Sequence, residues 1–221
     1  MDRSVLIVVI PAYREAGTIG QVVADIRQHA PVIVVDDASG DATAEVAAAA
    51  GADVFVNACN MGYEGALNVG FLIAAARKPR AILTVDADGE HGAEHVVSFA
   101  RLLLDESVPL VLGRRLRPQR AAESAVGALT RIRYGVSDVF CGMKGYHTEL
   151  WRRHGCFDSR MGVGTELALA AIRGGVPFRE IAVSGKPRKD APRFGNRLSA
   201  NWRILCAVNR SLGAPAVSIS K

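Results

Sequence analysis

Short runs of aliphatic residues alternate along the chain with longer segments whose apolar residues recur at helical spacing. The aliphatic runs have the composition of parallel strands that are covered on both faces. They lie at residues 5–10, 31–35, 53–56, 82–85 and 108–113. Helices are predicted between them, over residues 18–26, 41–51, 60–77 and 93–104. Strands that alternate with helices in this way favour an α/β fold with a mostly parallel central sheet flanked by helices.

The pattern becomes less regular and more basic after Gly113. The elements predicted in this part are a strand at residues 139–146, a helix at 164–173, a strand at 178–183 and a helical segment carrying Leu198, Trp202 and Leu205. Residues 185–197 are rich in basic and poor in apolar side chains, which is typical of a mobile loop.

Composition and charge agree with one globular domain. The chain has 221 residues, of which 49% are hydrophobic and 22% charged, enough to bury a core. The formal charge is +5, and the basic excess sits late in the chain, after an acidic centre. This asymmetry favours phosphorylated ligands or an anionic membrane surface over nucleic acid.

The cysteines and the apolar segments indicate the compartment. Cys59, Cys141, Cys156 and Cys206 form no CxxC pair or metal-ligand spacing, so we expect reduced thiols in a cytoplasmic protein. The N-terminal apolar run is too short for a signal peptide, and no segment reaches the about 20 residues that span a membrane. We therefore expect a soluble protein that at most lies on the cytoplasmic face of a membrane.

Asp86 and Asp88 directly follow the predicted strand 82–85. If the strand continues through them, both carboxylates point the same way, because alternate side chains share a face. A cation relieves the repulsion between two such carboxylates. Their oxygen atoms suit Mg²⁺ or Mn²⁺, which also bind diphosphates. Aspartate and the following Gly89 are also ordinary turn residues, so a solvated turn is the alternative.

Two other predicted strands end in loops of related character, at residues 11–15 and at Asp36-Asp37. In open parallel sheets, ligands bind beyond the carboxyl ends of the strands. The three loops should therefore meet at one edge of the sheet, where acidic residues and later basic residues could hold a metal-bridged diphosphate.

Four motifs follow one another in roughly the first hundred residues. They are Val9-Ile10-Pro11-Ala12-Tyr13-Arg14-Glu15, Val34-Val35-Asp36-Asp37-Ala38-Ser39, the glycine-rich stretch from Asn60 to Gly70, and Asp86-Ala87-Asp88-Gly89-Glu90-His91. In this order they resemble the family 2 glycosyltransferases with the GT-A fold, and look closest to the branch of dolichyl- or polyprenyl-phosphate sugar synthases. A weaker similarity continues through Asp138 to Tyr146, Glu166 and Arg193-Phe194-Gly195.

The resemblance implies an inverting, metal-dependent transferase that takes a sugar from a GDP- or UDP-sugar. The residues implied to bind the donor nucleotide are Pro11, Ala12, Tyr13, Glu15, Asp37, Gly65 and Asp86; the implied ligands of Mg²⁺ or Mn²⁺ are Asp86, Asp88 and Glu90; and the implied catalytic residues are Asp88, Glu166 and Arg193. Glu90 replaces the glutamine that is usual in the branch, so we expect stronger metal binding or a changed metal preference. Ala38 stands where relatives more often have glycine.

The resemblance also divides the domain into two halves. Residues 1–113 would bind the nucleotide sugar, and residues 114–221, with the basic loop and the C-terminal helix, would bind the acceptor. A polyprenyl phosphate acceptor is favoured, because it is already an anion and needs no strong general base. The side chains that would hold its phosphate are Arg114, Arg117, Arg120, Ser124, Arg131, Arg193 and Arg197.

Several alternatives stay open from the sequence. The acceptor could be a saccharide or small-molecule hydroxyl, with Glu166 as the general base, although Glu166 equally suits a helix start. The arginines after Gly113 could form a solvated face. A sugar nucleotidyltransferase normally opens with a glycine-rich loop that residues 11–15 lack, and the intact acidic pair argues against a non-catalytic nucleotide-binding protein. A homo-oligomer is also open. Four histidines without a visible acid or thiol partner are expected to have no function: His29, His95, His147 and His154.

Overall fold

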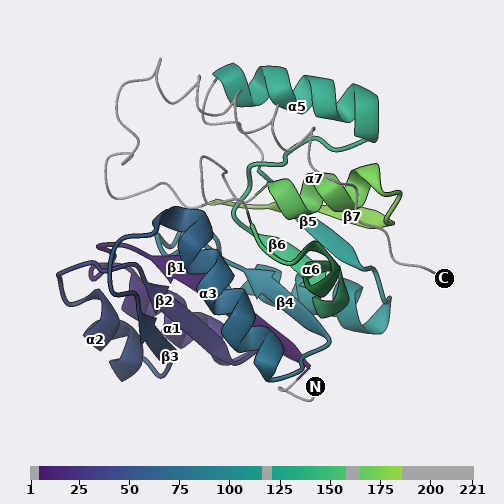
Figure 1. Ribbon diagram of the computed structural model, residues 1–221. Helices are drawn as coiled ribbons and strands as arrows, with labels where there is room; N and C mark the ends of the chain where they lie inside the picture. The colour runs from purple at the N-terminus through teal and green to yellow at the C-terminus, as the bar shows by residue number, and fades with distance from the viewer. Residues whose placement is uncertain (1–4, 116–120, 158–164, 186–221) are drawn as a thin grey trace.

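A seven-stranded sheet forms the centre of the molecule in a computed structural model, which describes residues 5–115, 121–157 and 165–185 (Figure 1). The strand order is β3-β2-β1-β4-β6-β5-β7. The strands are β1 (Leu6–Ala12), β2 (Val32–Asp36), β3 (Asp53–Val56), β4 (Ala81–Thr84), β5 (Leu110–Arg115), β6 (Lys144–His147) and β7 (Phe178–Val183). The helices are α1 (Ile19–Ile26), α2 (Thr43–Ala49), α3 (Gly62–Ala76), α4 (Glu94–Ala100), which continues as the π-helical turn Arg101–Asp105, α5 (Ala121–Tyr134), α6 (Thr148–His154) and α7 (Glu166–Arg173).

The predicted fold class is confirmed. Strand β1 pairs in parallel with β2 and β4, β2 with β3, and β5 with β7. Only β6, among the described strands, runs antiparallel to its neighbours, β4 and β5. The sheet is therefore mostly parallel, with one reversed strand in its second half.

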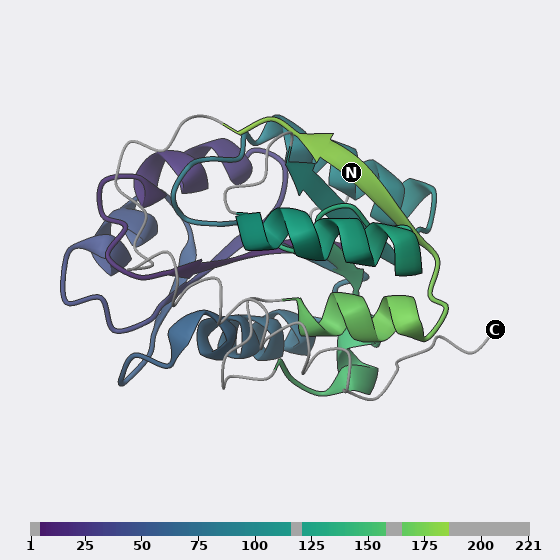
Figure 2. The ribbon, with the colours of Figure 1, turned by 90° about the horizontal axis from the view of Figure 1, so that it is seen from above.

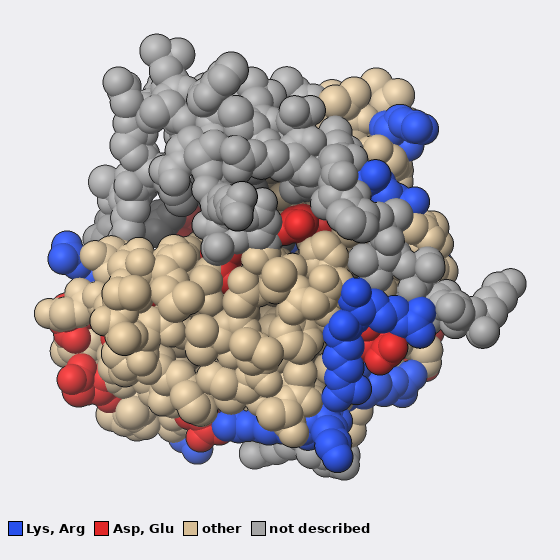
Figure 3. Space-filling model, viewed as in Figure 1, with Lys and Arg blue, Asp and Glu red and all other residues tan. Residues whose placement is uncertain are grey.

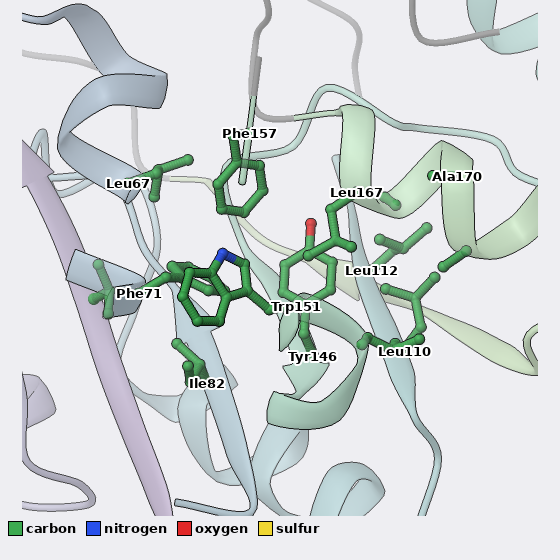
Figure 4. Packing of buried hydrophobic residues seen from close by; sticks show 14 of the residues in the cluster. Leu67, Phe71, Ile82, Leu110, Leu112, Tyr146, Trp151, Phe157, Leu167 and Ala170 are labelled. Carbon is green, nitrogen blue, oxygen red and sulfur yellow. The ribbon is translucent and has the colours of Figure 1, made fainter. Parts of the chain in front are cut away.

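Helices cover both faces of this sheet (Figure 2). On one face, α3, α6 and α7 pack over a core centred on Phe71, whose ring lies 5.9 Å from that of Tyr146, 6.0 Å from Trp151 and 5.0 Å from Phe157 (Figure 4). On the other face, α1 and α4 bury their apolar sides against the same strands. Within the described residues, no helix has both the length and the apolar character needed to cross a membrane.

Two predicted strand boundaries were wrong. Strand β1 does not stop before Pro11 but includes Pro11 and Ala12, which pair with β2. Proline is tolerated there because the pairing of β1 with β4 has already ended at Val9, so the missing N–H leaves that side of the ladder intact. Strand β6 begins only at Lys144, and the segment before it is a loop.

Helix α5 was not predicted, and Arg115 explains its position. The Arg115 guanidinium donates to both carboxylate oxygens of Asp138, at 2.8 and 3.0 Å, and to Glu123 of α5 at 3.0 Å. Burial opposes ionisation of Asp138, but the hydrogen bonds and charge of Arg115 outweigh it, so the pKa of Asp138 is lowered. Arg115 is thus part of a buried ion-pair network that ties α5 to the end of β5, and the solvated-face interpretation does not hold for it.

Candidate active site at the carboxyl edge of the sheet

The loops that follow β1 and β2 are joined by hydrogen bonds. The backbone N–H of Asp37 donates to the Ala12 carbonyl at 2.8 Å, and that of Arg14 donates to the Ser39 hydroxyl at 2.8 Å. The backbone N–H of Glu15 donates to the Thr43 hydroxyl, also at 2.8 Å. The predicted meeting of these loops is confirmed, and the bonds preorganise this part of the edge.

The implied nucleotide residues lie along this joined edge. Pro11 and Ala12 are buried at the end of β1, and Tyr13 is half-buried just beyond it. The buried Glu15 carboxylate accepts a hydrogen bond of 2.9 Å from the hydroxyl of Thr18, which stands at the N-cap position of α1 but makes no side-chain cap bond. Gly65 is buried within α3 against Met61. Their contacts with a nucleotide remain predictions.

Asp37 has a structural partner at both carboxylate oxygens. One oxygen accepts from the Asn57 side chain at 2.7 Å and from the backbone N–H of Met61 at 2.8 Å, and the other from the N–H of Gly62 at 2.8 Å. A carboxylate at this position satisfies N–H groups at the start of α3 and suits the helix dipole. Asp37 therefore fixes α3 at the edge, and its role toward the base or ribose stays a prediction.

Ala38, beside it, adopts a left-handed backbone conformation with φ of 58°. Glycine enters this region without the steric cost of a Cβ atom, which is about 1–2 kcal/mol for other residues. The conformation gives a physical reason for the glycine that relatives more often carry here.

Asp86 and Asp88 do not share a strand face, and this prediction was wrong. Strand β4 ends at Thr84, and Ala87 and Asp88 form a turn that Gly89 completes with φ of +75°. Asp86 accepts a hydrogen bond of 3.0 Å from the Tyr63 hydroxyl on α3. Strand alternation therefore does not place the two carboxylates, although both lie near enough to His91 to oppose the lowering of its pKa.

Tyr63 and Gly142 hold the Asp86 carboxylate between them. Burial and the Asp86 charge raise the pKa of Tyr63 well above its usual value, which keeps its hydroxyl protonated as a donor. On the other side, a methyl group on Gly142 would overlap both Asp86 oxygens. The Gly142 backbone is itself fixed, because its carbonyl accepts from the Thr84 hydroxyl at 2.6 Å. The sequence did not single out either residue.

Asp88 opens into a pocket of about 380 Å³ between α1 and the turn after β4. The other polar residues that line this pocket are Thr18, Gln21, Asp25, Gln28, His29, His91 and Glu94. The His91 side chain is buried, with Nε2 at 3.9 Å from the Cys141 thiol. Burial lowers the pKa of His91 although the charges of Asp86 and Asp88 oppose this shift, so the imidazole is held in its neutral form.

The residues around the turn fit a divalent cation that is completed by a ligand. In the described part of the chain, no three His, Cys, Asp or Glu side chains are grouped as a ready-made metal site, so Asp86, Asp88 and Glu90 do not form one. Mg²⁺ is usually bound by one or two carboxylates together with substrate phosphates and water, rather than by a protein cage. Asp88, half-buried and facing a pocket, supplies such a carboxylate.

The chain beyond β7 begins beside this turn. His91 pairs with Gly185 in an isolated β-bridge, and the backbone N–H of Ser184 donates to Nε2 of His95 at 3.1 Å. His95, expected to have no function, thus anchors the end of β7 to α4. The predicted acceptor residues Arg117, Arg120, Arg193 and Arg197 and the helical segment with Leu198, Trp202 and Leu205 lie outside the described residues.

The other predicted acceptor residues are described. Arg114 is exposed in β5, and Ser124 and Arg131 are exposed on α5. Glu166 is the first residue of α7, and its carboxylate lies 3.6 Å from Nε2 of His154 at the end of α6. The sequence could not show this acid, because it is 12 positions away along the chain and on another helix; at 3.6 Å it pairs only with a protonated His154, whose Nε2 has no hydrogen-bond partner among the described residues.

Replacing Tyr63 with phenylalanine tests whether the Tyr63 hydroxyl orients Asp86. Loss of a hydrogen bond to a charged group costs about 1.5–3 kcal/mol, so we expect kcat/KM to fall roughly 10- to 100-fold. The matched control is Tyr134→Phe on α5, which removes a hydroxyl far from Asp86 and should leave the kinetics unchanged. Equal kinetics for Tyr63→Phe and the unmodified chain would show that Asp86 needs no such support.

The sequence of the chain is similar to that of known proteins. The sequence model of "Glycosyl transferase family 2" matches residues 7–161. The chain is 33% identical to the uncharacterized glycosyltransferase Mb0553 of Mycobacterium bovis, over 85% of this chain and 88% of the relative. It is 26% identical to the uncharacterized protein MJ1222 of Methanocaldococcus jannaschii, over 93% of this chain and 91% of the relative.

A solved structure shares the fold. Glucosyl-3-phosphoglycerate synthase from Mycobacterium tuberculosis, in complex with Mn²⁺, UDP and glucosyl-3-phosphoglycerate, superposes with a TM-score of 0.76. The sequence identity is 22%, and the match covers 95% of this chain and 80% of the synthase. Other crystals of that synthase contain Mg²⁺ with UDP, or Mn²⁺ with UDP-glucose and phosphoglyceric acid.

Proposed function

We propose that this chain, which belongs to glycosyl transferase family 2, transfers a sugar from a nucleoside diphosphate sugar to the hydroxyl group of a small phosphorylated acceptor. The observation that carries the proposal is the edge at which the loops after β1, β2 and β4 converge, with Asp86 held in place and Asp88 facing a pocket. A UDP-sugar is the first donor to test, because the synthase with the same fold is described with UDP.

Asp86 and Asp88 would contact different parts of the donor. Asp86, with one oxygen bonded to Tyr63, is positioned to accept a hydrogen bond from a hydroxyl of the ribose or the sugar. Asp88 would hold Mg²⁺ or Mn²⁺ against the diphosphate. When bound, the cation supplies positive charge that offsets the negative charge of the departing nucleotide. The loops after β1 and β2 are already hydrogen-bonded to each other, so they would hold the nucleoside without further ordering.

The residues on the acceptor-binding half of the domain favour an acceptor that reacts through a hydroxyl group over one that reacts through a phosphate. A hydroxyl needs a group that takes up its proton, and Glu166 at the start of α7 supplies a carboxylate for this role, with Nε2 of His154 at 3.6 Å. The phosphoglycerate acceptor of the solved synthase carries both a hydroxyl and a phosphate, which fits the surplus of basic residues late in this chain. A polyprenyl phosphate, which the sequence resemblance favours, is the competing acceptor.

Product analysis tests the proposal. The chain should be incubated with Mn²⁺ and either UDP- or GDP-sugars, in separate reactions with 3-phosphoglycerate and other small phosphorylated hydroxyl compounds or with a polyprenyl phosphate. We expect release of nucleoside diphosphate that depends on a small acceptor and stops when EDTA removes the metal. A glycolipid product would instead assign the lipid acceptor, and pyrophosphate release would indicate nucleotidyl transfer. No metal-dependent release with any donor would contradict the proposed function.

A further inference from the structure

Helix α3 has an outer side without charge. Its sequence from Gly62 to Ala76 contains a single charged residue, Glu64, and that residue is buried. Apart from the half-buried Tyr63 and Asn68, whose polar groups bond Asp86 and the Phe157 backbone, the side chains that reach solvent from this helix are apolar, and Leu72 at its centre is 60% exposed. A helix that is apolar on all sides is normally covered on all sides.

The exposed apolar surface continues onto the edge strand β3. Helix α3 packs over β1 and β2, and Arg77 directly after it bonds Asp53 at the start of the neighbouring edge strand β3 at 2.6 Å. Phe55 of β3 (37%) and Met61 at the turn into α3 (48%) are unusually exposed for their type. We call the whole area the α3 surface; it comprises the exposed Phe55, Met61, Leu72 and Ala76 and the half-buried Val69 and Ile73.

Charges of opposite sign border the α3 surface on its two sides. Figure 3 shows a broad area without charged side chains over α3, with acidic side chains toward α2 and a group of basic ones at the other side. The basic border comes from α6, which contacts α3 through Arg152 and carries the exposed Arg152 and Arg153. The acidic border comes from the exposed Asp41 and Glu45, before and on α2.

We propose that the α3 surface is the interface of a twofold-symmetric dimer of this chain. In a twofold interface the same patch meets itself, so an uncharged centre pairs with an uncharged centre. When the twofold axis runs between the two borders, the acidic border of one copy faces the basic border of the other. An anionic membrane fits less well, because the acidic border would be repelled by it. The dimer would also fix α3, which carries Tyr63 and is bonded to Asp37.

Sedimentation equilibrium with the full chain tests this dimer. We expect a dimer at micromolar concentrations, and a dissociation constant about 100-fold higher for Leu72→Asp, because a twofold interface buries two copies of Leu72. The matched control is Ile132→Asp on α5, where an aliphatic side chain is 87% exposed but lies on another part of the molecule. This control should leave both the dimer and the melting temperature unchanged, whereas Leu72→Asp should lose only the concentration-dependent part of the melting temperature that the dimer contributes.

Charge reversal tests the twofold arrangement separately. Arg152→Glu with Arg153→Glu should weaken the dimer, and adding Asp41→Lys with Glu45→Lys in the same chain should restore it. A chain that stays monomeric up to about 100 µM, or a dimer that withstands Leu72→Asp, would overturn the proposal. If reversing the charges of one border leaves the dissociation constant of the dimer unchanged, the acidic border of one copy does not face the basic border of the other.

Discussion

Asp88→Asn is expected to lower kcat by about 10³-fold. Asparagine keeps the size of the side chain but removes the negative charge that would hold a divalent cation against the diphosphate. Charge stabilisation by such a cation contributes several kcal/mol, and each 1.36 kcal/mol corresponds to a factor of ten in rate. Steady-state kinetics with saturating donor and Mn²⁺ measures the loss, and calorimetry should show that nucleotide binding no longer depends on the metal.

Asp25→Asn provides the matched control for this substitution. Asp25 lines the same pocket as Asp88, but its carboxylate accepts a hydrogen bond from Gln21 at 2.7 Å within α1. The same change of charge at this position should alter kcat by less than about twofold. Activity of Asp88→Asn within a factor of ten of the unmodified chain would remove Asp88 from the reaction.

Gly142→Ala is expected to lower kcat/KM roughly 100-fold while the chain stays folded. The added methyl group would overlap the Asp86 carboxylate, which cannot turn away without losing its bond of 3.0 Å from Tyr63. The Gly142 backbone is held by Thr84, so the carboxylate is the group that has to move. Overpacking of this kind costs about 1–3 kcal/mol of stability, which chemical denaturation measures.

A double-mutant cycle separates this effect from a general loss of packing. In a chain that already carries Asp86→Ala, the methyl group meets no carboxylate, so Gly142→Ala should add little further loss of activity. Gly17→Ala is the control for adding a methyl group nearby, because a Cβ at Gly17 meets no atom within 4 Å. Full additivity of the two losses would mean that Gly142 does not act through Asp86.

The convergence of the loops was predictable because residues that are unusual inside strands mark the end of each predicted strand. The aliphatic runs that became β1, β2 and β4 stop within a few residues of acidic or proline-containing segments, and a parallel sheet brings such ends together. The glycine-rich start of α3 was also visible, and Gly70 does pack against Val9 and Val35 of the sheet. These features depend on local pattern and on one topological rule.

The arrangement around Asp86 depended on partners far away in sequence. Tyr63 lies 23 positions before Asp86 on another helix, and Gly142 belongs to a loop before the antiparallel strand β6. The alternation of β4 could not show that the strand ends at Thr84, so that Asp88 lies in a turn and not on a strand face. The sequence could not distinguish Arg115 from the other arginines after Gly113, because its partners Asp138 and Glu123 are brought to it only by the fold. Periodicity carries no information about such pairs.

The central claim is that a divalent cation links Asp88 to the diphosphate of the donor at the carboxyl edge of the sheet. Crystals grown with Mn²⁺ and the nucleoside diphosphate that binds most tightly would test it through the anomalous scattering of the metal. We expect a manganese peak at bonding distance from an Asp88 carboxylate oxygen, close to the roughly 2.1 Å of Mg²⁺–oxygen bonds, with a phosphate oxygen as another ligand. An ordered nucleotide at this edge without manganese at Asp88, or a nucleotide bound elsewhere, would contradict the account.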